Sequence, residues 1–87
     1  TVTLLAKASA MNAVVDRFGE DVLVTPAEED VARVHVTVME SPTFYGWLAQ
    51  FGEDITIEAP QSTRAAYAAH LRSILSSYEK PNETTPA

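Results

Sequence analysis

The chain has 87 residues, with 12 acidic and 6 basic side chains, a formal net charge of −6 and no cysteine. A chain of this length forms one domain, and its 46% of hydrophobic residues is too high for a disordered chain. The lack of cysteine excludes disulfides, thiolate metal sites and thiol nucleophiles. The acidic balance argues against direct electrostatic binding of nucleic acid, which depends on clustered Lys and Arg.

The first half of the sequence predicts a strand, a helix and two further strands, over residues 2–7, 10–18, 21–25 and 31–39. Ser9 is expected to cap the helix, and Gly19 lies where a glycine commonly ends one. The second strand is expected to stop at Pro26 and the acidic turn that follows. In the 31–39 strand, valines alternate with polar residues, which predicts one buried and one exposed face.

The second half begins with a strong helix signal. Ser41 is suited to the N-cap and Pro42 to the first helical position, and Gly52 is expected to end this helix. A strand over residues 54–58 and a helix over residues 62–79 follow. The apolar stripe predicted for the last helix consists of Tyr67, Leu71, Ile74, Leu75 and Tyr78.

The predicted order β-α-β-β-α-β is that of the ferredoxin-like α+β fold. Right-handed crossovers place both helices on one face of a four-stranded antiparallel sheet, and the last helix is an addition whose position the sequence leaves open. We expect a single domain over residues 1–79 and a flexible tail over residues 80–87. The chain opens on Thr1 rather than methionine, so we expect it to be part of a larger protein.

The residues predict neither catalysis nor metal or cofactor binding. No nucleophile, base and orienting group stand at a known spacing, and no glycine-rich phosphate loop is present. His35 and His70 lack neighbours at metal-ligand spacing. Together with Arg33, His35 lies on the polar face of the 31–39 strand, where a surface or partner contact is expected.

The sequence holds neither a secretory signal nor an apolar run near the ~20 residues that span a bilayer, which predicts a cytoplasmic protein.

Two features have alternative interpretations. The helix that follows Ser41 is crowded with aromatic residues, which belong either to the core or, through Tyr45 or Trp47, to a partner contact. Arg64 lies at the head of the apolar stripe of the last helix. Its aliphatic stem could lie along the edge of the core, or its guanidinium could contact an anion or a neighbouring domain.

A series of motifs adds a family resemblance. The segment SPTFYGWLAQFG (41–52), then ITIEAP (55–60), Arg64 and LRSILSSY (71–78) follow one another in order. This series resembles the C-terminal extension (WCX) domain of WYL-domain-containing, DeoR-type helix-turn-helix transcription regulators of bacteria. The front of the chain fits as well, so that the resemblance covers residues 1–79.

The resemblance implies a non-enzymatic regulatory and oligomerisation domain of a homodimeric regulator. DNA would be bound by an N-terminal helix-turn-helix, and a small-molecule or nucleic-acid effector by the neighbouring WYL domain. Arg64 matches the family's arginine after the proline, and Trp47 matches its aromatic helix. The alternative from another class is a small-molecule sensor like the ACT type of ferredoxin-like domain.

Overall fold

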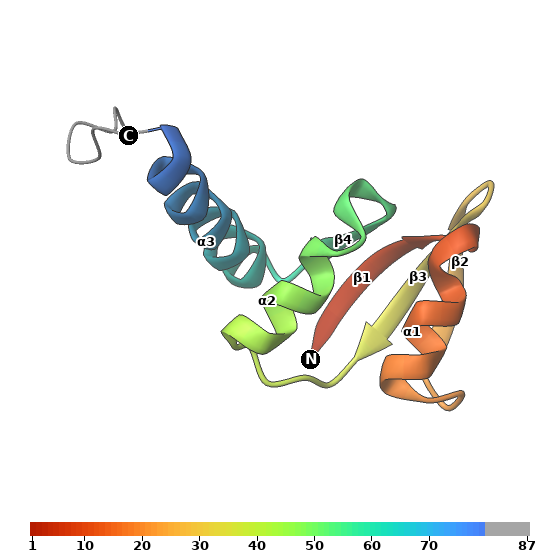
Figure 1. The fold of residues 1–87 in the computed structure, drawn as a ribbon. Coiled ribbons are helices and arrows are strands. Elements are labelled where there is room, and N and C mark those ends of the chain that lie inside the picture. Colours follow the sequence, from red (N-terminus) through yellow and green to blue (C-terminus); the bar gives the residue numbers. More distant parts are fainter. Residues whose placement is uncertain (80–87) are drawn as a thin grey trace.

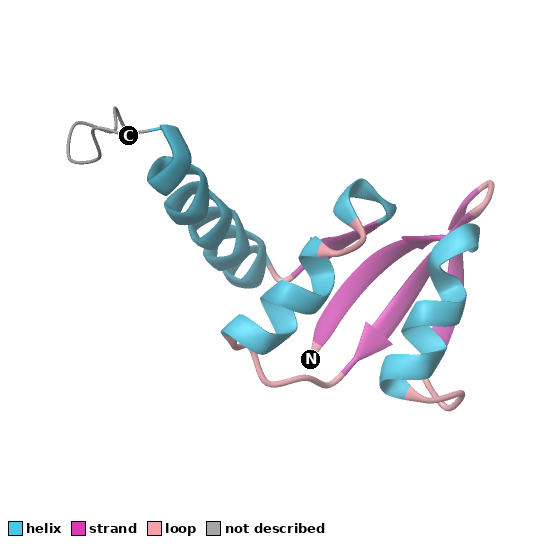
Figure 2. Cartoon of the chain, viewed as in Figure 1, coloured by secondary structure: helices cyan, strands magenta, loops and turns pink. Residues whose placement is uncertain are grey.

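The computed structural model describes residues 1–79 of the chain. Along the sequence its elements are β1 (Val2–Lys7), η1 (Ala8–Ala10), α1 (Met11–Phe18), β2 (Leu23–Glu28), β3 (Val31–Val36), α2 (Pro42–Ala49), η2 (Gly52–Asp54), β4 (Ile55–Ala59) and α3 (Gln61–Glu79). The four strands form one antiparallel sheet in the order β2-β3-β1-β4. Helices α1 and α2 lie on the same face of this sheet (Figures 1 and 2). The predicted ferredoxin-like α+β fold with an added C-terminal helix is therefore confirmed.

The core lies between the sheet and the two short helices. Val34 and Val36 of β3 are almost fully buried, as the alternation of valines predicts. Ile55 and Ile57 of β4 point to the same side of the sheet. From the helices, Val14 of α1 and the Phe44–Leu48 pair of α2 close this core. Because side chains alternate along a strand, the opposite face of the sheet carries the polar residues.

The prediction that β2 stops at Pro26 is wrong, because the strand runs on to Glu28. β2 is an edge strand, with β3 as its single neighbour in the sheet. A proline is tolerated there because its nitrogen faces no further strand that would need an N–H donor. The pairing shifts register between Pro26 and Glu28, so the irregularity is absorbed as a bulge.

Other predicted boundaries shift for local reasons. Ser9 does not cap α1, because it lies inside the 3₁₀ turn η1, and Ala10 precedes the helix without a side-chain cap. β3 ends at Val36, which pairs with Val2 at the very start of β1, so the chain beyond it has no neighbouring strand. The α-helix α2 ends at Ala49, since the next N–H groups bond three residues back in a tighter turn.

Two expected capping positions are as predicted, whereas Gly52 does not end α2 and is instead the first residue of η2. The Ser41 side chain accepts a hydrogen bond from the backbone N–H of Phe44 at 3.3 Å, and a proline follows at the first helical position. Gly19 follows α1 with φ 91° and ψ 168°, a conformation that is essentially restricted to glycine. These residues fix where the two short helices begin and end on the sheet.

Helix α3 leaves the body of the domain. It starts beside the edge strand β4 and projects away from the sheet (Figure 1). Thr63 in its first turn is fully buried, whereas every residue from Leu71 to Glu79 is exposed. The sequence left the position of this helix open, and the structure places most of it outside the core. The predicted tail over residues 80–87 lies outside the described residues.

Candidate functional site

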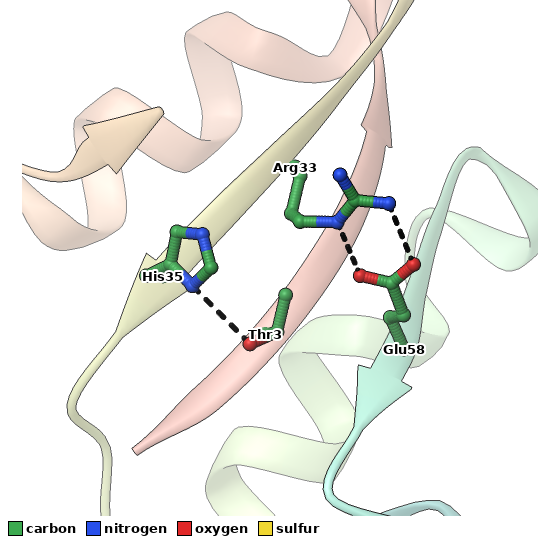
Figure 3. A network of polar contacts seen from close by, with 4 residues as sticks. All are labelled: Thr3, Arg33, His35 and Glu58. Carbon is green, nitrogen blue, oxygen red and sulfur yellow. Dashed lines mark hydrogen bonds and ion pairs between the residues drawn. The ribbon is translucent and has the colours of Figure 1, made fainter. Parts of the chain in front are cut away.

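The face of the sheet that carries no helix presents a polar network (Figure 3). Arg33 of β3 reaches across the central strand β1 to Glu58 of β4, with both guanidinium Nε and Nη2 donating to the carboxylate, the latter over 2.9 Å. Beside them, Thr3 Oγ1 and His35 Nδ1 lie 3.3 Å apart, and these two residues are also direct partners in the β1–β3 register. The network therefore ties three neighbouring strands together on the open face.

Glu58 is the electrostatic centre of this network. Its hydrogen bonds from Arg33 hold the pKa of the Glu58 carboxyl below its ordinary value, and the positive charges of Arg33, His35 and Arg64 act in the same direction. Reciprocally, the hydrogen bond with Glu58 raises the pKa of Arg33. Three of the predicted contact residues, Arg33, His35 and Arg64, thus lie close enough to act on one carboxylate. Sequence reasoning did not select Glu58, although its place on the polar face of β4 was readable from the alternation with Ile57.

The aromatic residues of α2 are used within the domain. Trp47 packs edge-on against Phe18 of α1, with ring centroids 5.3 Å apart, and against Phe51 at 5.1 Å. Phe44 is fully buried beneath them. Trp47 itself remains partly exposed. The cluster joins the two helices that cover the sheet, and it accounts for most of the aromatic crowding seen in the sequence.

Tyr45 belongs to a second cluster, which attaches α3 to the body. Its ring lies 5.4 Å from that of Tyr67 and 5.0 Å from that of His70, both on α3. Burial raises the pKa of Tyr45, and its contact with the Glu40 carboxylate raises it further. The buried Thr63 hydroxyl donates to Glu40 over 2.8 Å. Neither Glu40 nor Thr63 carries a signal in the sequence, because each gains its role only when α3 returns to the loop before α2.

An apolar groove runs along the base of α3. Its volume is about 400 Å³, and its walls come from α2, η2, β4 and α3. Ala49, Ile57, Tyr67 and Ala68 contribute apolar surface to it, and Arg64 lies among its lining residues. Arg64 is exposed, so the structure places its side chain at the boundary between the groove and solvent.

From Leu71, at the end of the groove, α3 exposes a row of large apolar side chains toward its C-terminus. Leu71, Ile74, Leu75 and Tyr78 have exposed fractions of 40%, 46%, 53% and 84%. Surface apolar residues are ordinary when they are scattered, but a contiguous row of them marks an interaction surface. We call Leu71, Ile74, Leu75 and Tyr78 the α3 stripe.

The described residues offer little for a metal or a membrane. Among residues 1–79, no three His, Asp or Glu side chains gather as a metal ion would require. In the same part of the chain, none of the helices combines the length and the apolar character needed to cross a bilayer.

Comparison with known proteins identifies one family. The family model of the WCX domain matches residues 1–75, which is nearly the whole described part of the chain. The WCX domain is the C-terminal domain of WYL-containing regulators, and it is a regulatory domain rather than a known enzyme. Neither a curated protein nor a solved structure matches the chain. The match agrees with the split βαβ order, the aromatic helix α2 and Arg64 behind Pro60, and the chain belongs to the WCX domain family.

Proposed function

We propose that this domain is the regulatory and oligomerisation domain of a bacterial, DeoR-type transcription regulator that acts as a homodimer in the cytoplasm. The family match over residues 1–75 carries the proposal. The domain over residues 1–79 would be one module of that regulator, with DNA bound by an N-terminal helix-turn-helix. The WYL domain would receive the small-molecule or nucleic-acid effector.

The charge distribution supports the assignment of DNA binding to another domain of the regulator. The domain has twice as many acidic as basic side chains, and DNA phosphates repel such a surface. On the open face the guanidinium of Arg33 is already held by Glu58. Arg64, with its exposed position at the groove, is the residue we assign to contact with the neighbouring domain or its effector. We assign a second contact to His35 on the open face of the sheet, while Tyr45 and Trp47 pack against α3 and α1.

An electrophoretic mobility shift experiment tests this assignment. The complete regulator, a form lacking this domain and the 87-residue chain alone are each titrated onto the regulator's own promoter DNA. We expect the complete regulator to bind, the chain alone to show no binding at 0.15 M salt, and the truncated form to bind more weakly because half-sites are then occupied singly. Binding of the chain alone with the affinity of the complete regulator would contradict the proposal.

The groove at the base of α3 supports a second candidate function, that of a small-molecule sensor. Its volume of about 400 Å³ lies within the range of small-molecule sites, and Arg64 could pair with a carboxylate on an otherwise apolar ligand. A thermal-shift screen with amino acids, fatty acids and nucleotides tests this function, because a ligand that binds only the folded state raises its apparent stability. An Arg64→Ala variant should lose the shift if the ligand is a carboxylate.

A further inference from the structure

The α3 stripe continues a heptad pattern that starts inside the domain. Arg64, Tyr67, Leu71, Ile74 and Tyr78 follow one another at alternating spacings of three and four residues. This is the spacing at which one helix packs along another. The first half of the seam is satisfied internally, since Tyr67 lies against Tyr45. Leu71 lies at the end of the groove, and the residues beyond it are exposed without a covering element among the described residues. A short overhanging helix is unstable by itself in water. The missing neighbour is therefore expected to be a helix.

We infer that the α3 stripe is covered by α3 of a second copy of this chain, packed antiparallel about a twofold axis near Ser73. This interface rests on the homodimer of the proposed function and specifies its geometry. In this register Leu71 faces Leu75 of the second copy, and Ile74 lies beside the axis. Tyr78 faces Ala68 of the second copy, whose side chain lines the apolar groove. The overhang of each copy thus fills the groove of the other.

Charge favours this pairing over other occupants of the stripe. Of the 12 acidic residues in the chain, α3 contains only Glu79, whereas it carries Arg64 and Arg72. Two copies with a net charge of −6 each repel least where these helices meet. The antiparallel register brings Glu79 within about one turn of Arg64 in the second copy. A parallel register would align Arg64 with Arg64 and leave both grooves empty.

The surface is large enough for a specific but modest interface. Tyr78 alone exposes 84% of an aromatic side chain, which amounts to roughly 150–200 Å². With the half-exposed aliphatic residues and the walls of the groove, counted in both copies, the buried area reaches about 1,000 Å², the lower limit for a specific interface. We therefore expect a dimer that dissociates on dilution rather than a permanent one.

Light scattering after size-exclusion chromatography tests the location of the interface, with a matched pair of variants. Leu75 on the stripe and Leu23 on the open sheet face are similarly exposed, at 53% and 63%. The molar mass of the wild-type chain should rise from monomer to dimer between about 1 μM and 1 mM protein. Leu75→Asp should weaken dimerisation by about 30-fold or more, because the twofold axis places the change in the interface twice. Leu23→Asp should leave dimerisation unchanged, and circular dichroism confirms that both variants fold.

Single cysteines test the antiparallel register, since the chain has no cysteine of its own. Under mild oxidation Ile74→Cys should form a disulfide-linked dimer, because the two copies of this position lie next to the axis. Ser76→Cys faces the opposite side of α3 and should remain monomeric on a denaturing gel. Tyr78→Cys should also fail to cross-link, because its two copies lie about 15 Å apart along the helix pair.

Each result has a defined meaning. A wild-type chain that stays monomeric at every concentration would overturn both the interface and oligomerisation by this domain. A dimer that Leu75→Asp leaves intact would overturn the interface alone, and so would efficient cross-linking of Tyr78→Cys, which indicates parallel helices. A small molecule that binds the groove and leaves the mass monomeric would reassign the groove to a ligand.

Discussion

Besides the ring contacts of Tyr45, one buried hydrogen bond attaches α3 to the body, and removing it is the most informative stability experiment. The Thr63 hydroxyl is fully buried and donates to Glu40 over 2.8 Å, whereas Glu40 itself is exposed. Thr63→Val keeps the shape of the side chain and removes the donor. Hydrogen bonds to charged groups contribute about 1.5–3 kcal/mol, and water can replace Thr63 at the exposed acceptor, so we expect a loss at the low end, about 1–2 kcal/mol.

A double-mutant cycle isolates this bond from its surroundings. Glu40→Ala leaves the Thr63 hydroxyl buried without its partner, a state that costs about 1–3 kcal/mol. The Glu40→Ala variant also loses the contact with Tyr45, but this second loss is common to both arms of the cycle and cancels. The double variant should therefore be less destabilised than the sum of the single variants by about 1–2 kcal/mol.

The assay is urea denaturation at a fixed protein concentration, because dimerisation would otherwise add to the measured free energy of unfolding. Thermal melts provide a second readout, since each kcal/mol shifts the midpoint by roughly 4–8 °C in a domain of this size. Additive effects within about 0.3 kcal/mol would show that the two side chains are not coupled. In that case the position of α3 would depend on its apolar and ring contacts, such as those of Tyr45 with Tyr67 and His70.

Three further predictions concern the body of the domain. Phe44→Ala should lower the free energy of unfolding by about 3–5 kcal/mol, because the ring is fully buried; a loss below about 1 kcal/mol by urea titration would contradict this packing. Glu58→Gln should be less stable than wild type above the ordinary carboxyl pKa of 4.5, and the difference should disappear as pH falls through the lowered pKa of folded Glu58. Thermal melts at a series of pH values measure this stability difference, and a difference that grows as the pH falls would contradict the lowered pKa of Glu58. Gly19→Ala should lower the free energy of unfolding by about 1–3 kcal/mol, because Gly19 has a positive φ. Gly46→Ala in α2, where a Cβ meets no atom within 4 Å, should instead raise the free energy of unfolding by about 0.4–1 kcal/mol. Equal effects of the two substitutions in thermal melts would refute the conformational argument.

Much of the body of the domain was predictable because its signals are local. The valine alternation of β3 and the capping of α2 by Ser41 each depend on a few neighbouring residues. The order of the elements then limits the topology, because short right-handed connections leave few arrangements of four strands and two helices. For the same reason the family resemblance could be stated from the motif series alone.

The boundaries that failed depend on which strands become neighbours. Pro26 ends a strand in the middle of a sheet but not at its edge, and the position of β2 at the edge is a property of the whole fold. β3 stops at Val36, which is the partner of Val2, the first residue of β1. The sequence could not supply either fact, since both are set by pairing between distant segments.

The net charge of −6 argues against direct electrostatic binding of nucleic acid by this domain, and this inference required no structure. The sequence by itself also determined the fold class and the family, because hydrophobic periodicity, helix capping and the order of the motifs depend on residues that are close together in the sequence. Only the tertiary structure decided what the side chains of interest do. It paired Arg33 with the unselected Glu58 across β1, and it tied Thr63 to Glu40. It also left the stripe of α3 exposed, because packing between elements far apart in sequence fixes which apolar faces are covered.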